Sequence, residues 1–332
     1  MEENMPLLAS IFFGFVPMFL FAAFINWLDR YEKEPKALLG AAFMWGVLIA
    51  GGGAYIINTL LGLGVYIVTG SEGATGFATA SIIAPIVEES LKGLAVLVVF
   101  FLFRKEFDSV LDGIIYAGIT ALGFAAIENV LYIYEYGYQE SGWSGLWQLV
   151  FIRVILVGWQ HPFYTAFTGI GLAIARMNRS FPVKILAVLG GFSMAVFTHA
   201  FHNTFGGLIG GIEGLAIGTF VDWVGWFFML VFITWMIVSE RNILKRHLQA
   251  EVHSGLISPA QYHTALSFAQ SGARLNALSS GNYLATSRFY QVCGELAHKK
   301  EQYIRLGDER GNQAIIENLR GELTRLAPQA RT

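Results

Sequence analysis

Residues 84–92 read Ala-Pro-Ile-Val-Glu-Glu-Ser-Leu-Lys and lie within an otherwise apolar segment, 77–103. A segment of this length can cross the hydrocarbon core of a bilayer as a helix. Ionisable side chains are costly inside such a segment, so Glu88, Glu89 and Lys92 predict a functional site within the membrane. The stretch therefore indicates an all-α polytopic membrane protein in which a few buried charges carry the function.

The whole chain has the composition of a membrane protein. Of its 332 residues, 55% are hydrophobic and 14% are charged, whereas a soluble domain typically carries about 25% charged residues. A disordered chain, a nucleic-acid-binding protein and an ordinary cytosolic enzyme are thereby excluded. Residues 1–240 contain 10 Lys and Arg against 17 Asp and Glu, and residues 241–332 contain 12 against 7. We therefore expect a membrane domain, 1–239, followed by a basic tail, 240–332.

About seven transmembrane helices are predicted, because seven apolar segments have spanning length and none alternates with the period of a β-barrel. The first lacks the basic N-terminal region of a cleaved signal peptide and is predicted to be retained. A further apolar run, 62–69, is too short to cross and is predicted to be a loop or an interfacial segment. The spans run near 6–28, 36–60, 77–103, 110–136, 146–175, 183–207 and 215–238.

The orientation follows from the loops. Eight basic residues lie in the first, third and fifth loops, and none lies in the second, fourth or sixth. Because Lys and Arg favour cytoplasmic loops, we expect an extracytoplasmic N-terminus and a cytoplasmic C-terminus in the cell membrane. The tail is predicted to be a small helical region, with one helix starting at Ser258-Pro259. It contains no catalytic motif, and its sequence indicates neither a role nor a partner.

Ionisable side chains lie at a similar depth in four of the predicted spans. Besides Glu88 and Glu89 in the third span, Glu128 lies in the fourth, His161 in the fifth and His199 in the sixth. At 1.5 Å per residue, these groups lie about 10–17 Å below the outer surface. Because their exposure to lipid is costly, we expect them to converge on an internal polar cavity.

The local spacing of these residues supports a shared cavity. Glu88 and Lys92 are four residues apart and share a helix face, so the lysine can partly neutralise the carboxylate pair. His199 and Asn203 are also four residues apart, and His202 lies close to the same face. Adjacent glutamates point about 100° apart around a helix, so one of the pair is expected to enter the cavity and the other to be paired.

At these residues the chain resembles the PrsW family of intramembrane proteases and, more distantly, the CAAX-prenyl-endopeptidase superfamily. The resemblance covers roughly residues 27–207 and does not include the tail. His202 is not a position of the family pattern. The motifs are Glu-Glu-x-x-Lys at Glu88, Glu89 and Lys92, Phe-x-x-x-Glu at Phe124 and Glu128 continuing into Asn129, a membrane histidine at His161 following Arg153, and His-x-x-x-Asn at His199 and Asn203.

The resemblance implies an intramembrane endopeptidase that cleaves membrane-anchored substrates near the extracytoplasmic side. In the best known case the substrate is an anti-sigma factor, and cleavage starts a stress response. The expected partners are therefore a single-pass membrane protein and the lipid bilayer, with no nucleic acid. The candidate catalytic residues are Glu88, Glu89, Glu128, His161, His199 and Asn203, and the supporting residues are Lys92, Asn129 and His202.

Two mechanisms of peptide hydrolysis remain open for this set. In the metal mechanism, Glu128, His161 and His199 bind Zn²⁺ with an open position for water, and Glu88 acts as the general base. In the glutamate mechanism there is no metal: Glu88, with Glu128 nearby, takes the proton of water, while His199 and Asn203 donate hydrogen bonds to the oxyanion. The family is classed as metalloproteases, which favours the metal mechanism.

Other interpretations of the buried charges stay open. Glu, His and Lys within seven spans are also typical of a proton-coupled transporter or a seven-helix receptor, although here they gather at one depth instead of crossing the membrane. A non-catalytic scaffold that binds substrate helices is expected to lack one or more of the key residues, and here all are present. Taken singly, Arg153 is expected to snorkel to the outer interface, and His202 to have a structural or supporting role.

Overall fold

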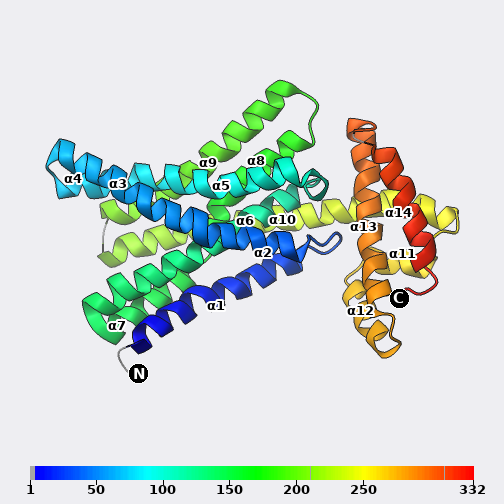
Figure 1. Cartoon of the computed structure of the whole chain (residues 1–332), viewed down its shortest axis with the longest axis horizontal. Coiled ribbons are helices and arrows are strands. Elements are labelled where there is room, and N and C mark those ends of the chain that lie inside the picture. The colour runs from blue at the N-terminus through cyan, green and yellow to red at the C-terminus, as the bar shows by residue number, and fades with distance from the viewer. Residues whose placement is uncertain (1–3, 210, 310) are drawn as a thin grey trace. The chain divides into compact units, whose positions relative to one another are not determined.

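The computed structural model describes residues 4–209, 211–309 and 311–332 (Figure 1). The described residues form helices and no strand, which confirms a helical polytopic membrane protein. The chain divides into two compact units, each described by itself. The membrane unit comprises Met1–Trp27, Pro35–Arg176 and Pro182–Phe232, and the tail unit comprises Leu28–Glu34, Met177–Phe181 and Ile233–Thr332.

The membrane unit is built from long apolar helices that are interrupted by short π-helical turns. Such turns are frequent at functional sites because they shift the register of the residues that follow them. The helices are α1 (Met5–Leu28), α2 (Lys36–Trp45), α3 (Gly52–Thr69), α4 (Glu72–Ala78), α5 (Ala84–Leu102), α6 (Val110–Leu131), α7 (Gln139–Val150), α8 (Gln160–Arg176), α9 (Phe181–Ile209) and α10 (Gly211–His253), which continues into the tail unit. The π-helical turns are η2 (Gly46–Gly51), η3 (Thr79–Ile83), η5 (Tyr132–Tyr138) and η6 (Phe151–Leu156).

Among the described residues, five helical stretches are long and apolar enough to cross a membrane. Their bounds are Met5–Leu28, Lys36–Thr69, Val110–Arg176, Phe181–Phe205 and Gly211–His253. The third stretch contains both the fourth and the fifth predicted spans. The third predicted span corresponds to η3 and α5, where three charged side chains interrupt the apolar run. The number seven therefore stays a prediction.

The structure refines two of the predicted spans. Residues 62–69 are not a loop: they complete α3, which ends where Gly70 takes the left-handed conformation (φ +62°). The fifth predicted span, 146–175, is interrupted at residues 157–159, just before α8. Pro162 in the first turn of α8 has no N–H to continue a preceding helix, and the Trp223 indole donates to the Leu156 carbonyl at 2.9 Å, which satisfies one group freed by the break.

Helix α6 is the centre of the membrane unit and is buried along most of its length. It begins with a capping box between Ser109 and Asp112. Its close crossing with α8 depends on Gly113 and Gly169, because a Cβ at Gly169 would lie 2.0 Å from the Gly113 carbonyl oxygen. Small residues allow membrane helices to approach this closely. The crossing helices place the end of α6, which carries Glu128, beside the start of α8.

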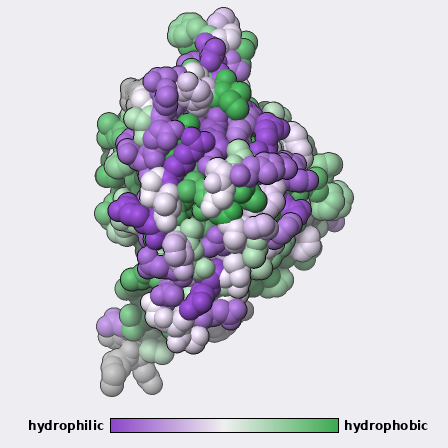
Figure 2. All heavy atoms as spheres, turned by 90° about the vertical axis from the view of Figure 1, so that its right-hand side faces the viewer, coloured by the Kyte–Doolittle hydropathy of each residue, from purple (hydrophilic) through white to green (hydrophobic). Residues whose placement is uncertain are grey.

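The tail unit packs around α13 (Tyr283–Leu306), with α14 (Asn312–Leu326) beside it (Figure 1). Two shorter helices, α11 (Pro259–Ala265) and α12 (Ala269–Ser279), complete the unit, and Ser258 caps α11 as expected. The side of the tail unit turned towards the viewer in Figure 2 is mostly hydrophilic. A polar surface over a helical core is typical of a folded domain in water.

A loop from the membrane domain belongs to the tail unit. The Lys33 backbone N–H donates to Gln291 Oε1 at 2.8 Å, and the Gln291 amide donates to the Lys33 carbonyl at 2.9 Å. Tyr31 is buried in the same core as Cys293, and Gly294 faces the Tyr31 carbonyl with no room for a side chain. The compact tail unit is therefore larger than the predicted segment 240–332.

Candidate functional site

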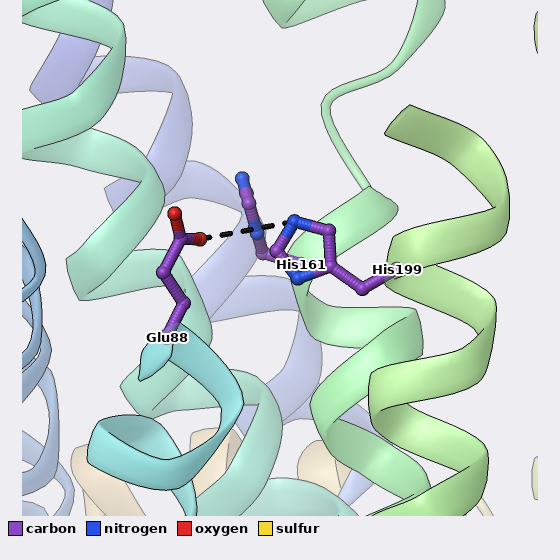
Figure 3. Close-up of side chains that lie close together, drawn as sticks. All are labelled: Glu88, His161 and His199. Atoms are coloured by element: carbon purple, nitrogen blue, oxygen red, sulfur yellow. Dashed lines mark ion pairs between the residues drawn. The ribbon is translucent and has the colours of Figure 1, made fainter. Parts of the chain in front are cut away.

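Four helices bring the predicted intramembrane residues together. Glu88 and Glu89 come from α5, Glu128 from the end of α6, His161 from the first turn of α8 and His199 from α9. In Figure 3 the carboxylate of Glu88 and the two imidazole rings point towards one another. The π-helical turns η3, η5 and η6 adjoin α5, α6 and the break before α8, so local helix irregularities position the site.

Glu88, His161 and His199 form a compact triad. Each offers one ligand atom, and these atoms all lie within 4.8 Å of one another. Glu88 Oε2 lies 3.8 Å from His199 Nε2. This buried oxygen has no hydrogen-bond partner among the described residues, whereas Glu88 Oε1 accepts a hydrogen bond of 3.4 Å from Asn58. A buried carboxylate oxygen without a donor is expected to bind water, a cation or a substrate group.

Glu89 and Lys92 lie behind the triad, on the side away from the cavity, and both are fully buried. Lys92 Nζ lies 2.6 Å from Glu89 Oε1 and 3.9 Å from Glu88 Oε2, so the lysine pairs more closely with Glu89 than with Glu88. Glu89 Oε1 also lies 3.0 Å from His199 Nδ1, and its other oxygen accepts a hydrogen bond from Thr165 at 2.8 Å. Glu88 is thus the member of the pair that faces the cavity, and Glu89 is the paired one.

Glu128 has two partners. Its carboxylate lies 2.8 Å from His161 Nε2 and forms an ion pair with Arg153. Arg153 Nε also donates to Asn129 Oδ1 at 2.8 Å, and the guanidinium lies over the Tyr132 ring. The expectation that Arg153 snorkels to the interface is therefore wrong, because a partly buried carboxylate and a buried amide one residue apart offer it two acceptors inside the protein.

Asn203 and His202 occupy a different part of the site from the triad. Asn203 Nδ2 donates to the Ala80 carbonyl at 2.9 Å and so ties α9 to η3. His202 Nδ1 lies 2.8 Å from Asp222 Oδ2 in α10. Asp222 was not among the predicted site residues, although it is the only charged residue of its predicted span, 215–238, and the rule applied to the other intramembrane charges identifies it too.

The triad opens into a cavity of about 1240 Å³ within the membrane unit. Glu88, Glu128, His161 and His199 all line it, and tyrosines such as Tyr132 contribute to the wall. The volume exceeds that of a typical small-molecule pocket. It is large enough for several residues of an extended peptide.

The donor types of the site suit a transition metal. In this structure both ring nitrogens of His161 are engaged, Nε2 with Glu128 at 2.8 Å and Nδ1 with Lys92 Nζ at 3.2 Å, so a metal would displace one of these contacts. Two imidazoles and a carboxylate form a common catalytic zinc set with one position left for water. Glu88 contributes an oxygen that lacks a donor, and His199 is held at Nδ1 by Glu89, the kind of carboxylate support that orients metal-binding histidines. The grouping differs from the predicted set, because Glu88 and not Glu128 joins the histidines, while Glu128 remains in contact with His161.

The fold and the site together define an integral membrane protein with a buried carboxylate–histidine cluster that opens into a large cavity. A sequence model of the family described as PrsW family intramembrane metalloprotease matches residues 34–236, so the chain belongs to this family. The match confirms the resemblance seen in the motifs and extends it through the span that contains Asp222.

Several curated relatives carry the name Protease PrsW. The protein of Geobacillus kaustophilus is 31% identical over 129 residues, which are 39% of this chain and 53% of the relative. That of Clostridioides difficile is 34% identical over 121 residues, covering 36% and 48%, and that of Bacillus subtilis is 25% identical over 170 residues, covering 51% and 70%. The chain spans about half the length of the first two. No solved structure matches the chain.

Proposed function

We propose that the chain is an intramembrane endopeptidase that hydrolyses a peptide bond of a membrane-anchored protein within the cavity. The observation that carries this proposal is the triad of Glu88, His161 and His199, in which a buried carboxylate oxygen without a donor faces two imidazoles at the wall of a peptide-sized cavity. Membership of a family of intramembrane metalloproteases favours peptide hydrolysis over the transporter, receptor and scaffold alternatives.

The polar residues of the chain divide the work of hydrolysis. A carboxylate facing the cavity, Glu88 or Glu128, takes the proton of the attacking water and later supplies one to the leaving amine. Arg153 and Lys92 balance the negative charge of these groups within the membrane. Glu89 holds the His199 ring, so that the imidazole keeps its direction while charge develops on the substrate carbonyl.

Zn²⁺ is the proposed cofactor, held by His161, His199 and one of the two cavity carboxylates. Bound zinc would supply a Lewis acid and an activated water. The compact grouping favours Glu88 as the third ligand, which leaves Glu128 beside His161 as the proton acceptor. Metal analysis of the purified protein tests this assignment: zinc that co-purifies with the wild type and is lost from His199→Ala supports it, and a fully active metal-free preparation contradicts it.

The proposed substrate is a single-pass membrane protein, such as an anti-sigma factor, cleaved near the extracytoplasmic side. The alternation of basic residues between the loops supports an extracytoplasmic N-terminus and a cytoplasmic C-terminus in the cell membrane. The depth estimated from the sequence places the site around or just above the midplane on the outer side. A stress response started by this cleavage is part of the same proposal.

The test in cells compares the membrane proteome of the wild type with that of Glu128→Ala. We expect a membrane-anchored protein to accumulate uncleaved in the variant, because it removes the carboxylate that contacts both His161 and Arg153. Glu88→Gln and His199→Ala are expected to give the same accumulation while still inserting normally. Identical proteomes in the wild type and all three variants would refute the peptidase function.

A further inference from the structure

A second buried polar cluster adjoins the site and has no assigned role. It consists of Asp222 in α10, His202 in α9, and Gln160 and Tyr164 in α8. The Asp222 side chain is 5% exposed and is the only charged group of its predicted span, 215–238. Because a buried carboxylate in a span is costly, such a residue is by default a functional candidate with its partners named.

Three side chains converge on the Asp222 carboxylate. Gln160 Nε2 donates to Oδ2 at 2.7 Å, and His202 Nδ1 lies 2.8 Å from the same oxygen. The Tyr164 hydroxyl donates to Oδ1 at a longer distance of 3.5 Å. Gln160 Nε2 also lies 2.8 Å from His202 Nε2, so the amide and the imidazole are held together as well as to Asp222. One carboxylate in α10 thereby orders polar side chains of two other helices.

Tyr164 connects this cluster to the triad. Its ring stacks on the His199 ring, with the centroids 4.9 Å apart and the planes 18° from parallel. Glu89 holds His199 at Nδ1, and a single hydrogen bond leaves the imidazole free to tilt about it. The stacked Tyr164 ring restricts that tilt. Tyr164, His202 and Gln160 also line the cavity, so the same carboxylate orders part of the wall that a substrate would contact.

We propose that Asp222 is a positioning residue of the site: it holds Tyr164 against His199 and fixes His202 and Gln160 on the cavity wall. This inference rests on the proposed peptidase function, and it names a further residue on which that function depends. The alternative is that Asp222 only attaches α10 to the rest of the membrane unit. A purely structural attachment predicts loss of folded protein, without a specific change at His199 or in turnover.

The first readout does not depend on activity. In protein selectively labelled with ¹⁵N-histidine, Asp222→Asn is expected to shift the ring signals of His202 and His199, since the variant removes the charge that both rings sense directly or through Tyr164. Trp223→Phe is the control for the attachment of α10, because it removes a hydrogen bond between α10 and η6 at the neighbouring position and substitutes none of the cluster's own side chains. Unchanged signals of both histidines in Asp222→Asn would overturn the proposal, whatever the fate of the proposed function.

The second readout is kinetic and uses the membrane protein that accumulates in Glu128→Ala cells as the probe. Asp222→Ala is expected to lower kcat about 10- to 100-fold, as is usual for residues that orient site ligands, with KM changed less than about twofold. Asp222→Asn keeps an oxygen that can accept the hydrogen bond of the Tyr164 hydroxyl, so its fall in kcat should be smaller. If the wild type itself does not cleave the probe, the proposed function fails, and the histidine signals still decide the role of Asp222.

A double variant tests whether Asp222 acts on His199 through Tyr164 or by a general disturbance of the membrane unit. Tyr164→Phe keeps the stacked ring and loses the hydroxyl, so adding it to Asp222→Ala should cause no further loss of kcat. Fully additive losses would contradict coupling through Tyr164. An equal fall of kcat in Trp223→Phe would show that the effect comes from loose attachment of α10 and would overturn the proposal. If Asp222→Ala does not fold, Asp222→Asn takes its place in these comparisons.

Discussion

At the scale of single residues, the structure replaces isolated charges with pairs. Glu128 binds Arg153 and His161, Glu89 binds Lys92 and His199, and Glu88 keeps one oxygen without a donor. A buried charge that loses its partner destabilises a protein by about 3–5 kcal/mol, so every member of a pair matters for the other. The exception is Glu88 Oε2, which has only the longer contacts with Lys92 and His199, and Glu88 lines the cavity.

Arg153 offers a test of this pairing. Arg153→Met removes the counter-charge of Glu128 and the donor to Asn129, so we expect cleavage to fall at least about tenfold. Arg153→Lys keeps the charge but replaces the planar guanidinium fork with a compact ammonium group, so its loss should be intermediate. The rates are measured in membranes that contain equal amounts of inserted protein. Wild-type cleavage by Arg153→Met would show that Glu128 does not need this partner.

At the scale of helices, glycine contacts position the site. The α6–α8 crossing sets the distance between Glu128 at the end of α6 and His161 at the start of α8. In Gly169→Ala the new Cβ would meet the Gly113 carbonyl oxygen, so the helices must separate. We therefore expect a lower thermal unfolding midpoint in detergent and reduced cleavage.

Gly190→Ala is the control, since a Cβ at Gly190 of α9 has no neighbour within 4 Å among the described atoms. The same chemical change at this open position should leave both the unfolding midpoint and cleavage close to those of the wild type. Equal midpoints for Gly169→Ala and Gly190→Ala would contradict the close-packing account.

The helical spans and most residues of the site could be predicted from the sequence, for reasons that particular residues show. Apolar length identified the helical spans, and the cost of buried charge identified Glu88, Glu128, His161 and His199. Hydropathy does not show where an apolar run is broken, so it does not locate the interruption at residues 157–159 or the π-helical turns. Which carboxylate pairs with Arg153 depends on helix rotation and packing, which a single sequence does not contain.

At the scale of the whole molecule, the tail unit has its own ionic core. Glu251 lies in the part of α10 that belongs to the tail unit, beyond the predicted span 215–238. It is buried, and Lys300 and Arg320 both donate hydrogen bonds to its carboxylate. Burial alone would raise the pKa of Glu251, but the hydrogen bonds and charges of Arg320 and Lys300 outweigh it and lower the pKa. Burial raises the pKa of the Cys293 thiol in the same unit, which keeps it protonated and unreactive.

The lowered pKa of Glu251 predicts a direction for the pH dependence of the tail unit. The ionised Glu251 carboxylate stabilises the folded tail unit at pH values above the pKa of a glutamate in the unfolded chain, about 4.3. This contribution to the free energy of unfolding is lost as the pH falls through the lower pKa of Glu251 in the folded protein. Glu251→Gln lacks the charge at any pH. At pH 7 we therefore expect it to unfold at a lower temperature than the wild type, with a gap that narrows on acidification.

Cys293 reports on the tail unit in the same experiment. At pH 7 the buried thiol of the wild type should resist maleimide labelling in the native protein and react once the unit is unfolded. Faster labelling in Glu251→Gln would place its instability in this unit. A gap in unfolding temperature that is constant between pH 7 and pH 3 would contradict the role assigned to the Glu251 charge.

The most direct test of the account is cleavage of a single-pass membrane protein by the purified chain reconstituted in liposomes, comparing the wild type with Glu88→Gln. The variant preserves the size of the side chain and replaces the carboxyl group that lines the cavity with an amide, which can neither exchange a proton in the same way nor bind a metal as a carboxylate. We predict cleavage by the wild type and none by Glu88→Gln, with both proteins folded and equally inserted. Cleavage at the wild-type rate by Glu88→Gln would contradict the claim that this intramembrane cluster hydrolyses peptide bonds.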